Sequence, residues 1–300
     1  MTQADYERVG SFLMRGDVPG AIAFMKGNPE LEEVAAAYLS VFEKEQYIRY
    51  DVPEKLNELL LCYQQYFRDV FFLRVAPARA EAVLFEKLKR ELASVNSDPS
   101  AIEEELERRF QQEGCRFLGG KTNGYYGPYV WKETVPMTFD VELPDTAGSY
   151  CVHMLRGVIL RGWMDYLTFG ERGTGGWTMP DGTIYCVERA YDINSERFRV
   201  SFLKHEAQHA EDRRRWPDME PRHLEYRAKL VELIYARETD LLEKFCREAD
   251  PNKTDDSHAA ASARIKREMG DGSFAGVGEI QSRAKTLFAA SSQEMAQYYG

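Results

Sequence analysis

The sequence predicts an α+β fold in which an all-helical region is followed by a region that contains strands. Apolar residues recur at helical spacing through the first 113 residues. From Cys115 to Ile193 the chain is instead rich in Gly, Tyr, Thr, Val and Trp, with turn signals such as Asn123-Gly124. Helical spacing returns after Ser195. We therefore expect a helical domain over residues 1–113, a domain with a sheet over 114–250 and a helical tail over 251–300.

The first 113 residues read as short helices joined by tight turns. Gly16-Asp17 and Gly27-Asn28-Pro29 separate the first helices, and Pro53, Pro77 and Pro99 each suit a helix start. Residues 12–22 loosely resemble a tetratricopeptide-type hairpin, but the period along the segment is irregular. We expect a helical bundle or a short solenoid, which could bind a protein partner.

The middle region predicts an antiparallel sheet. Runs of β-branched and aromatic residues lie between the turn signals, at residues 129–134, 137–143, 158–160, 166–169 and 183–190. The glycine-rich stretch from Gly170 to Trp177 lacks the Gly-Lys-Ser/Thr ending of a phosphate loop and does not lead into a helix. A flexible hairpin or a lid is the simpler expectation for it.

A metal-binding pattern follows the sheet. His205-Glu206-Ala207-Gln208-His209 is an H-E-x-x-H pentad, and Ser195 is a suitable N-cap for the helix that carries it. Two histidines four residues apart lie on one helix face, so both imidazoles can reach one ion. The glutamate between them points away from that line, where a general base can take a proton from a water that the ion activates. The pentad therefore predicts half of a tetrahedral Zn²⁺ site.

A third ligand is expected from the next helix. The pentad helix should end near Trp216-Pro217, and Pro221 should begin a helix that runs to about Arg247. Because a short turn joins the two helices, they should be antiparallel neighbours, which would bring the carboxylate of Glu225 opposite the imidazoles. The alternatives are Glu211, Asp212, Glu220 and His223. His223 could instead donate a hydrogen bond to a developing oxyanion.

These residues resemble the gluzincin metallopeptidases, the thermolysin-like zinc enzymes. The resemblance covers His205 to about Lys229, and the sheet before it only in the order of elements. It implies a zincin-like domain over residues 114–250, with His205, His209 and Glu225 as ligands and Glu206 as general base. Lys229 stands where such enzymes often have an acidic partner for a histidine, so Asp212 or Glu232 must take that role.

The expected activity is zinc-dependent hydrolysis of peptide bonds in a peptide or protein substrate. Two alternatives remain open. One is a helical-repeat interaction protein whose peptidase-like half is degenerate, and the other is a zinc hydrolase of non-peptide amides or esters. His153 and His258 have no partner pattern and are not expected to be ligands.

Composition excludes some classes of partner. The formal charge of −10 argues against nucleic-acid or anionic-membrane binding, since both need a basic surface. No window is apolar enough to span a bilayer, and the first residues do not resemble a signal peptide. The five cysteines are odd in number and never form a C-x-x-C pair. A cytoplasmic protein with reduced thiols is therefore expected.

Overall fold

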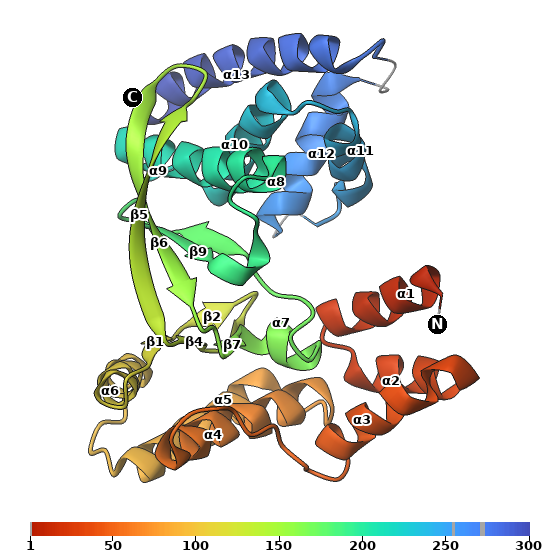
Figure 1. Ribbon diagram of the computed structural model, residues 1–300, viewed down its shortest axis with the longest axis vertical. Coiled ribbons are helices and arrows are strands. Elements are labelled where there is room, and N and C mark those ends of the chain that lie inside the picture. The colour runs from red at the N-terminus through yellow and green to blue at the C-terminus, as the bar shows by residue number, and fades with distance from the viewer. Residues whose placement is uncertain (1, 254–255, 271–273) are drawn as a thin grey trace. The chain divides into compact units, whose positions relative to one another are not determined.

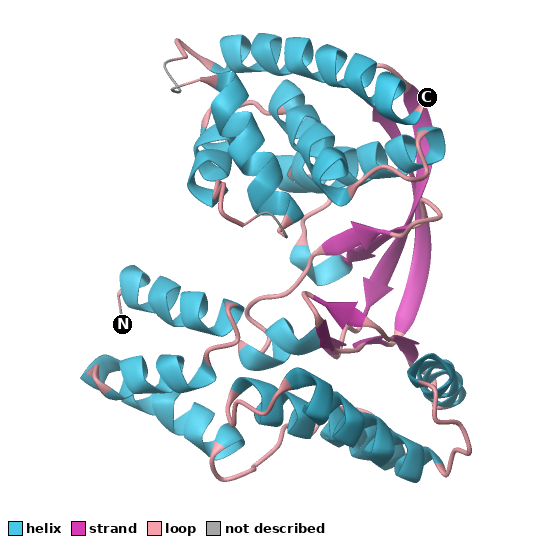
Figure 2. Cartoon of the chain, turned by 180° about the vertical axis from the view of Figure 1, so that it is seen from behind, coloured by secondary structure: helices cyan, strands magenta, loops and turns pink. Residues whose placement is uncertain are grey.

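The computed structural model describes residues 2–253, 256–270 and 274–300 of the chain. It confirms the predicted α+β class, with many helices and few strands (Figures 1 and 2). The chain divides into two compact units. Unit 1 holds residues 1–133 and 156–174, and unit 2 holds residues 134–155 and 175–300. This division differs from the three consecutive segments expected, because the chain leaves unit 1 at the first long strand, returns after the second and leaves again before residue 175.

Unit 1 begins with the helices that its apolar spacing predicts. A short 3₁₀ turn, Pro29–Leu31, precedes the third of them. Pro77 and Pro99 stand in the first turns of their helices as expected, and Asp98 caps the last helix by accepting a hydrogen bond from the backbone N–H of Ala101. The helices are α1 (Gln3–Met14), α2 (Val18–Lys26), α3 (Glu32–Phe42), α4 (Glu54–Phe71), α5 (Pro77–Leu92) and α6 (Pro99–Gln112).

Short strands complete unit 1. The antiparallel sheet β1-β4-β7 consists of β1 (Arg116–Leu118), β4 (Tyr129–Trp131) and β7 (Leu160–Arg161). The hairpin of β2 (Lys121–Thr122) and β3 (Tyr125–Tyr126) turns at Asn123-Gly124, where both residues have positive φ as an Asn-Gly turn requires.

The strand expected at residues 166–169 is wrong, because α7 (Gly162–Leu167) covers the first half of this segment and a turn follows. Trp163, Tyr166 and Leu167 are all buried, and their spacing is that of one helix face. They join the unit 1 core with large side chains from α4, including Phe67 and Phe71.

Unit 2 contains a four-stranded sheet in the order β5-β6-β9-β8. It is mixed rather than antiparallel, because β6 pairs with β9 in parallel while β8 pairs with β9 in antiparallel. The sequence did not predict β6, whose first residues are small and exposed and show no clear alternation. The strands are β5 (Glu133–Glu142), β6 (Ala147–Arg156), β8 (Gly176–Thr178) and β9 (Ile184–Val187).

One face of this sheet packs against the helix of the pentad. Ser195 caps the helical segment as predicted, accepting a hydrogen bond from the N–H of Phe198 at 3.1 Å. The segment continues through α8 (Glu196–Phe198) and a π-helical stretch, Arg199–Lys204, into α9 (His205–Arg215). The α9 helix ends directly before Trp216-Pro217, also as predicted. The shared core includes Val152, Met154, Ile184, Cys186, Phe198, Phe202 and Ala207.

The helix after the pentad begins where expected but ends early. Pro221 opens α10 (Pro221–Tyr235), and α11 (Asp240–Glu248) is a separate helix, so the single helix expected to reach Arg247 is wrong. Ala236 is extended, and the backbone N–H of Arg237 donates to Oε1 of Glu196 at 2.9 Å. This hydrogen bond lies just beyond the end of α10.

The C-terminal helices belong to the body of unit 2. Instead of forming a separate helical tail, α12 (Ser257–Met269) and α13 (Val277–Tyr299) both pack on α10 (Figure 1). Ile265, Ala284 and Phe288 are buried in the same core as Leu230 and Val231 of α10. The expected boundary at residue 250 therefore falls inside unit 2.

Two further features concern the length of the apolar helices and the cysteines. Among the helices of the described residues, none combines the length and apolarity that crossing a bilayer requires. None of the five cysteines is paired in a disulfide.

Candidate metal centre

The two pentad histidines lie one turn apart on α9 and are both buried. Their ring centroids are 4.5 Å apart and the ring planes are nearly perpendicular. The side chain of His205 is 10% exposed and that of His209 is 9% exposed. Helical spacing therefore brings both imidazoles to one place, as predicted.

Glu225 of α10 faces both histidines. Its Oε1 lies 3.3 Å from Nε2 of His209, and its Oε2 lies 3.5 Å from Nε2 of His205. One ligand atom from each of the three residues lies within 4.8 Å of the other two. Tetrahedral zinc with bonds of about 2.0 to 2.1 Å separates neighbouring ligand atoms by about 3.3 Å. The two nitrogen–oxygen separations are close to this value, so the three residues could hold a zinc ion.

Glu232, one of the two expected partners of a histidine ligand, contacts His205. Its Oε1 lies 2.7 Å from Nδ1 of His205, and both side chains are buried. A carboxylate on Nδ1 keeps the proton on that nitrogen and leaves Nε2 to face Glu225. Nδ1 of His209 is buried and has no hydrogen-bond partner within the described residues.

The acidic surroundings set the protonation of the centre. Burial by itself lowers the pKa of His205, but the hydrogen bond and charge of Glu232, with Glu225 and Glu206 nearby, raise it to about 9. Burial likewise raises the pKa of Glu225, but the hydrogen bond and charge of His209 and the contacts with His258 and His205 bring it well below its usual range. Without an ion, the protonated imidazole of His205 therefore lies against the carboxylates of Glu232 and Glu225.

Glu206, the expected general base, is fixed by a threonine of the sheet. Oγ1 of Thr178 donates to Oε2 of Glu206 at 2.8 Å and lies 3.1 Å from its backbone oxygen. Thr178 belongs to β8, the outer strand of the unit 2 sheet. The glutamate is 8% exposed. The sheet and the pentad helix thus meet at this carboxylate.

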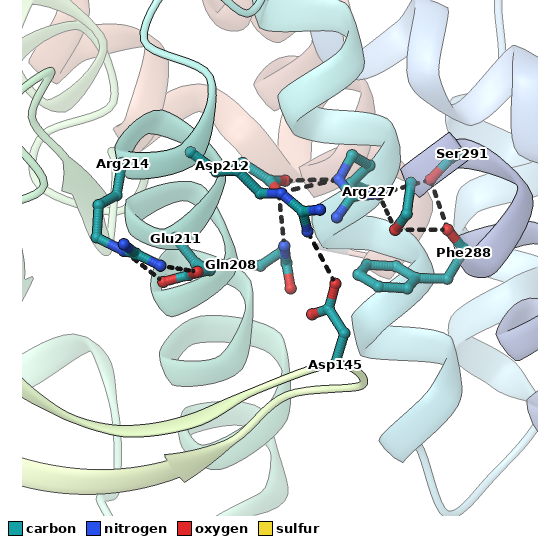
Figure 3. A network of polar contacts seen from close by, with 10 residues as sticks. Asp145, Gln208, Glu211, Asp212, Arg214, Arg227, Phe288 and Ser291 are labelled. Atoms are coloured by element: carbon teal, nitrogen blue, oxygen red, sulfur yellow. Dashed lines mark hydrogen bonds and ion pairs between the residues drawn. The ribbon is translucent and has the colours of Figure 1, made fainter. Parts of the chain in front are cut away.

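A buried ion pair joins the two helices of the centre. Both oxygens of Asp212 on α9 accept from Nε of Arg227 on α10, at 3.0 and 2.9 Å, and Gln208 donates to Asp212 at 2.8 Å (Figure 3). Arg227 also donates to the hydroxyls of Ser291 and Ser292 on α13. The side chains of Asp212 and Arg227 are each 1% exposed. This network therefore holds α9, α10 and α13 together.

The other candidate ligands pair elsewhere. Asp212 belongs to the network just described, Glu211 binds Arg214, and Glu220 binds Arg222. None of them belongs to the group of His205, His209 and Glu225.

The structure does not bring His223 to this group. Residues two apart in an α-helix point about 200° from one another, so His223 and Glu225 leave α10 on different sides. The His223 ring lies near Tyr298 and Tyr299 of α13, with centroids 6.4 and 6.3 Å away. Burial, with Arg222 and Arg264, lowers its pKa. This setting does not support the expected oxyanion contact.

Two residues of the site escaped sequence reasoning. His258, at the start of α12, has Nδ1 2.9 Å from Oε2 of Glu225. Thr178 reaches Glu206 from a short strand after the glycine-rich stretch. Neither residue stands in a spacing motif with the pentad, so only the tertiary structure shows their contacts.

Comparison with protein-family models, with curated proteins and with solved structures found no match for this chain. The functional assignment therefore depends on the site itself, whose residues His205, His209 and Glu225 could hold a metal ion.

Proposed function

We propose that the chain is a zinc-dependent hydrolase that cleaves peptide bonds, with His205, His209 and Glu225 as the ligands. One observation carries this proposal. Two buried imidazoles and a carboxylate from a second helix bring one ligand atom each within 4.8 Å of the other two, and each imidazole Nε2 lies 3.3 to 3.5 Å from a carboxylate oxygen. Three protein ligands leave one position open, which is the arrangement of catalytic rather than structural zinc.

In this proposal each residue has a defined task. Zinc, when bound, supplies a Lewis acid that activates water and polarises a carbonyl group. Glu232 holds the proton on Nδ1 of His205, so that Nε2 is the nitrogen that binds. Glu225 would supply the third protein ligand, and its carboxylate would neutralise part of the charge of the zinc ion.

Glu206 moves the proton. Thr178 occupies Oε2 of Glu206, so Oε1 would accept the proton from the attacking water and then deliver it to the leaving amine. The hydroxyl of Thr178 fixes the rotation of the carboxylate, and a fixed base loses less orientational freedom on reaching the transition state.

The position of β8 favours a peptide as substrate. This strand lies at the edge of the unit 2 sheet, and its last residue, Thr178, contacts the general base. An extended peptide that pairs with an edge strand would pass the base in a defined register.

We place the activity in the cytoplasm as part of the same proposal, because none of the five cysteines is in a disulfide.

The variant Glu206→Gln tests this assignment. It removes the base but none of the ligands, so the purified variant should retain zinc and lose hydrolysis by about 10²-fold or more. Zinc content and the rate of cleavage of a peptide library are measured side by side. His209→Ala is the matched variant that should lose both zinc and activity.

Full hydrolysis by Glu206→Gln would contradict the proposal. A wild-type chain that binds zinc and cleaves amide or ester substrates, but no peptide in the library, would correct the substrate class. A wild-type chain that binds no zinc would favour an interaction protein with a degenerate site.

A further inference from the structure

His258 contacts the third ligand of the candidate centre from a helix that the sequence places far from the pentad. Its Nδ1 lies 2.9 Å from Oε2 of Glu225, although the alignment of the two groups falls outside hydrogen-bond geometry. The side chain of His258 is 64% exposed, whereas that of Glu225 is 13% exposed. An exposed imidazole can turn about its side-chain bonds to align with the carboxylate.

The core of unit 2 determines where His258 lies. The α12 helix packs against α10, and Ile265 of α12 is fully buried between them. In the middle of α12, the guanidinium of Arg264 lies 3.9 Å from the ring centroid of Tyr226 on α10. At its start, Asp256 caps α12 by accepting from the N–H of Ala259 at 3.1 Å. These contacts place the first turn of α12 beside Glu225.

From this geometry we infer that His258 is a positioning residue for the ligand Glu225, and this inference rests on the metal site of the proposed function. The N–H at Nδ1 would hold Oε2 and leave Oε1 to bind the ion. Carboxylate ligands in metal sites are themselves held by hydrogen bonds, which select one oxygen and fix its direction. His258 thus does for Glu225 what Glu232 does for His205.

A direct bond from His258 to the ion is the competing role. The mutually close ligand atoms are those of His205, His209 and Glu225, and no nitrogen of His258 joins them. His258 instead contacts the oxygen of Glu225 that faces His205. An action through Glu225 therefore fits the geometry better.

Zinc affinity of the full chain tests the inference without a substrate. The dissociation constant of Zn²⁺ is measured by competition with a chelator, and His258→Ala should weaken it about 10-fold or more. His258→Asn carries an N–H at the position of Nδ1 and should recover most of the affinity. His258→Gln carries its N–H at the position of Nε2 and should not recover it. His223→Ala, which removes a histidine from the other side of α10, is the control and should bind zinc as the wild type does.

A double-mutant cycle separates positioning from direct binding. In the background Glu225→Ala, the further change His258→Ala should have no effect on zinc affinity, because the group it acts on is gone. A further loss of about 10-fold in that background would show a direct ligand and overturn the inference. Unchanged zinc affinity of His258→Ala alone would also overturn it. Thermal melting of the metal-free variants checks that α12 stays folded. We expect an unchanged melting temperature, because the side chain of His258 is largely exposed. A chain that binds zinc in this pattern but cleaves nothing would contradict only the proposed hydrolysis.

Discussion

The two ring nitrogens of His205 have different partners, and this difference organises the candidate centre. Nδ1 lies against Glu232 and Nε2 faces Glu225, so the ring is held from two sides before any ion binds. His209 has only one such contact, because its Nδ1 has no partner among the described residues. The orientation of the two imidazole rings therefore depends mainly on the contact between His205 and Glu232.

At a pH above the pKa of His205, which is about 9, Glu232→Gln should weaken zinc binding about 10-fold or more. The wild-type carboxylate favours the proton on Nδ1 and raises the basicity of the ring, and the variant loses this carboxylate. Chelator competition measures the effect. Glu243→Gln, on the exposed surface of α11, is the control and should leave zinc affinity unchanged. Equal zinc affinity in Glu232→Gln and the wild type would show that the contact is only structural.

The affinity for zinc should rise with pH between about pH 7 and 9. In the metal-free chain burial lowers the pKa of His205, but Glu232 and the neighbouring carboxylates raise it to about 9. Below that pH zinc must displace a proton, so affinity should increase up to tenfold per pH unit and then level off. Titrations at several pH values measure this slope. In Glu232→Gln the slope should move to lower pH, and a flat profile in the wild type would contradict the assignment.

At the scale of elements, the buried pair of Asp212 and Arg227 sets the spacing of the two ligand helices. Asp212→Ala should cost about 3 to 5 kcal/mol of unfolding free energy, because it leaves Arg227 buried without its partner. The double variant Asp212→Leu with Arg227→Met should restore most of this loss, since two apolar groups replace both charges. Urea unfolding of the metal-free chain measures both.

The exposed pair of Glu211 and Arg214 provides the comparison on the same helix. Arg214→Ala should change the unfolding free energy by less than about 1 kcal/mol, because exposed pairs contribute little. If Asp212→Ala also changed the unfolding free energy by less than about 1 kcal/mol, the network of Asp212 and Arg227 would not hold the helices together.

Local signals predicted the two ligand helices, whereas long-range packing decided the rest. Ser195 and Pro221 begin their helical segments as expected, and the pentad with Glu225 comes together as the short turn implies. Just after the early end of α10, Arg237 contacts Glu196, far back in the chain, and no local pattern reveals this contact.

The C-terminal helices show the same limit. Much of the face that α12 buries is made of small residues, such as Ala259, Ala261 and Ser262, which give a weak helical pattern in the sequence. The sequence therefore predicted only a helical tail over residues 251–300 and left His258 without a partner. Only the packing on α10 brings it to Glu225.

At the scale of the whole molecule, the candidate site lies entirely in unit 2, and each unit has its own core. A ligand that binds only the folded form stabilises the part that holds its site. Calorimetry of the metal-free chain should therefore show two transitions, of which zinc raises only one. Phe67→Ala, in the core of unit 1, should lower the other transition. A zinc-dependent shift of both transitions together would show that the units unfold as one.

The most direct test of the account is the zinc content of the purified chain. Elemental analysis of the wild type should find about one zinc per chain, and the variants His209→Ala and Glu225→Ala should retain little or none, because each loses one of three ligands. The contrary result is a wild-type chain that neither retains zinc nor takes it up when zinc is added. That result would show that His205, His209 and Glu225 do not form a metal centre.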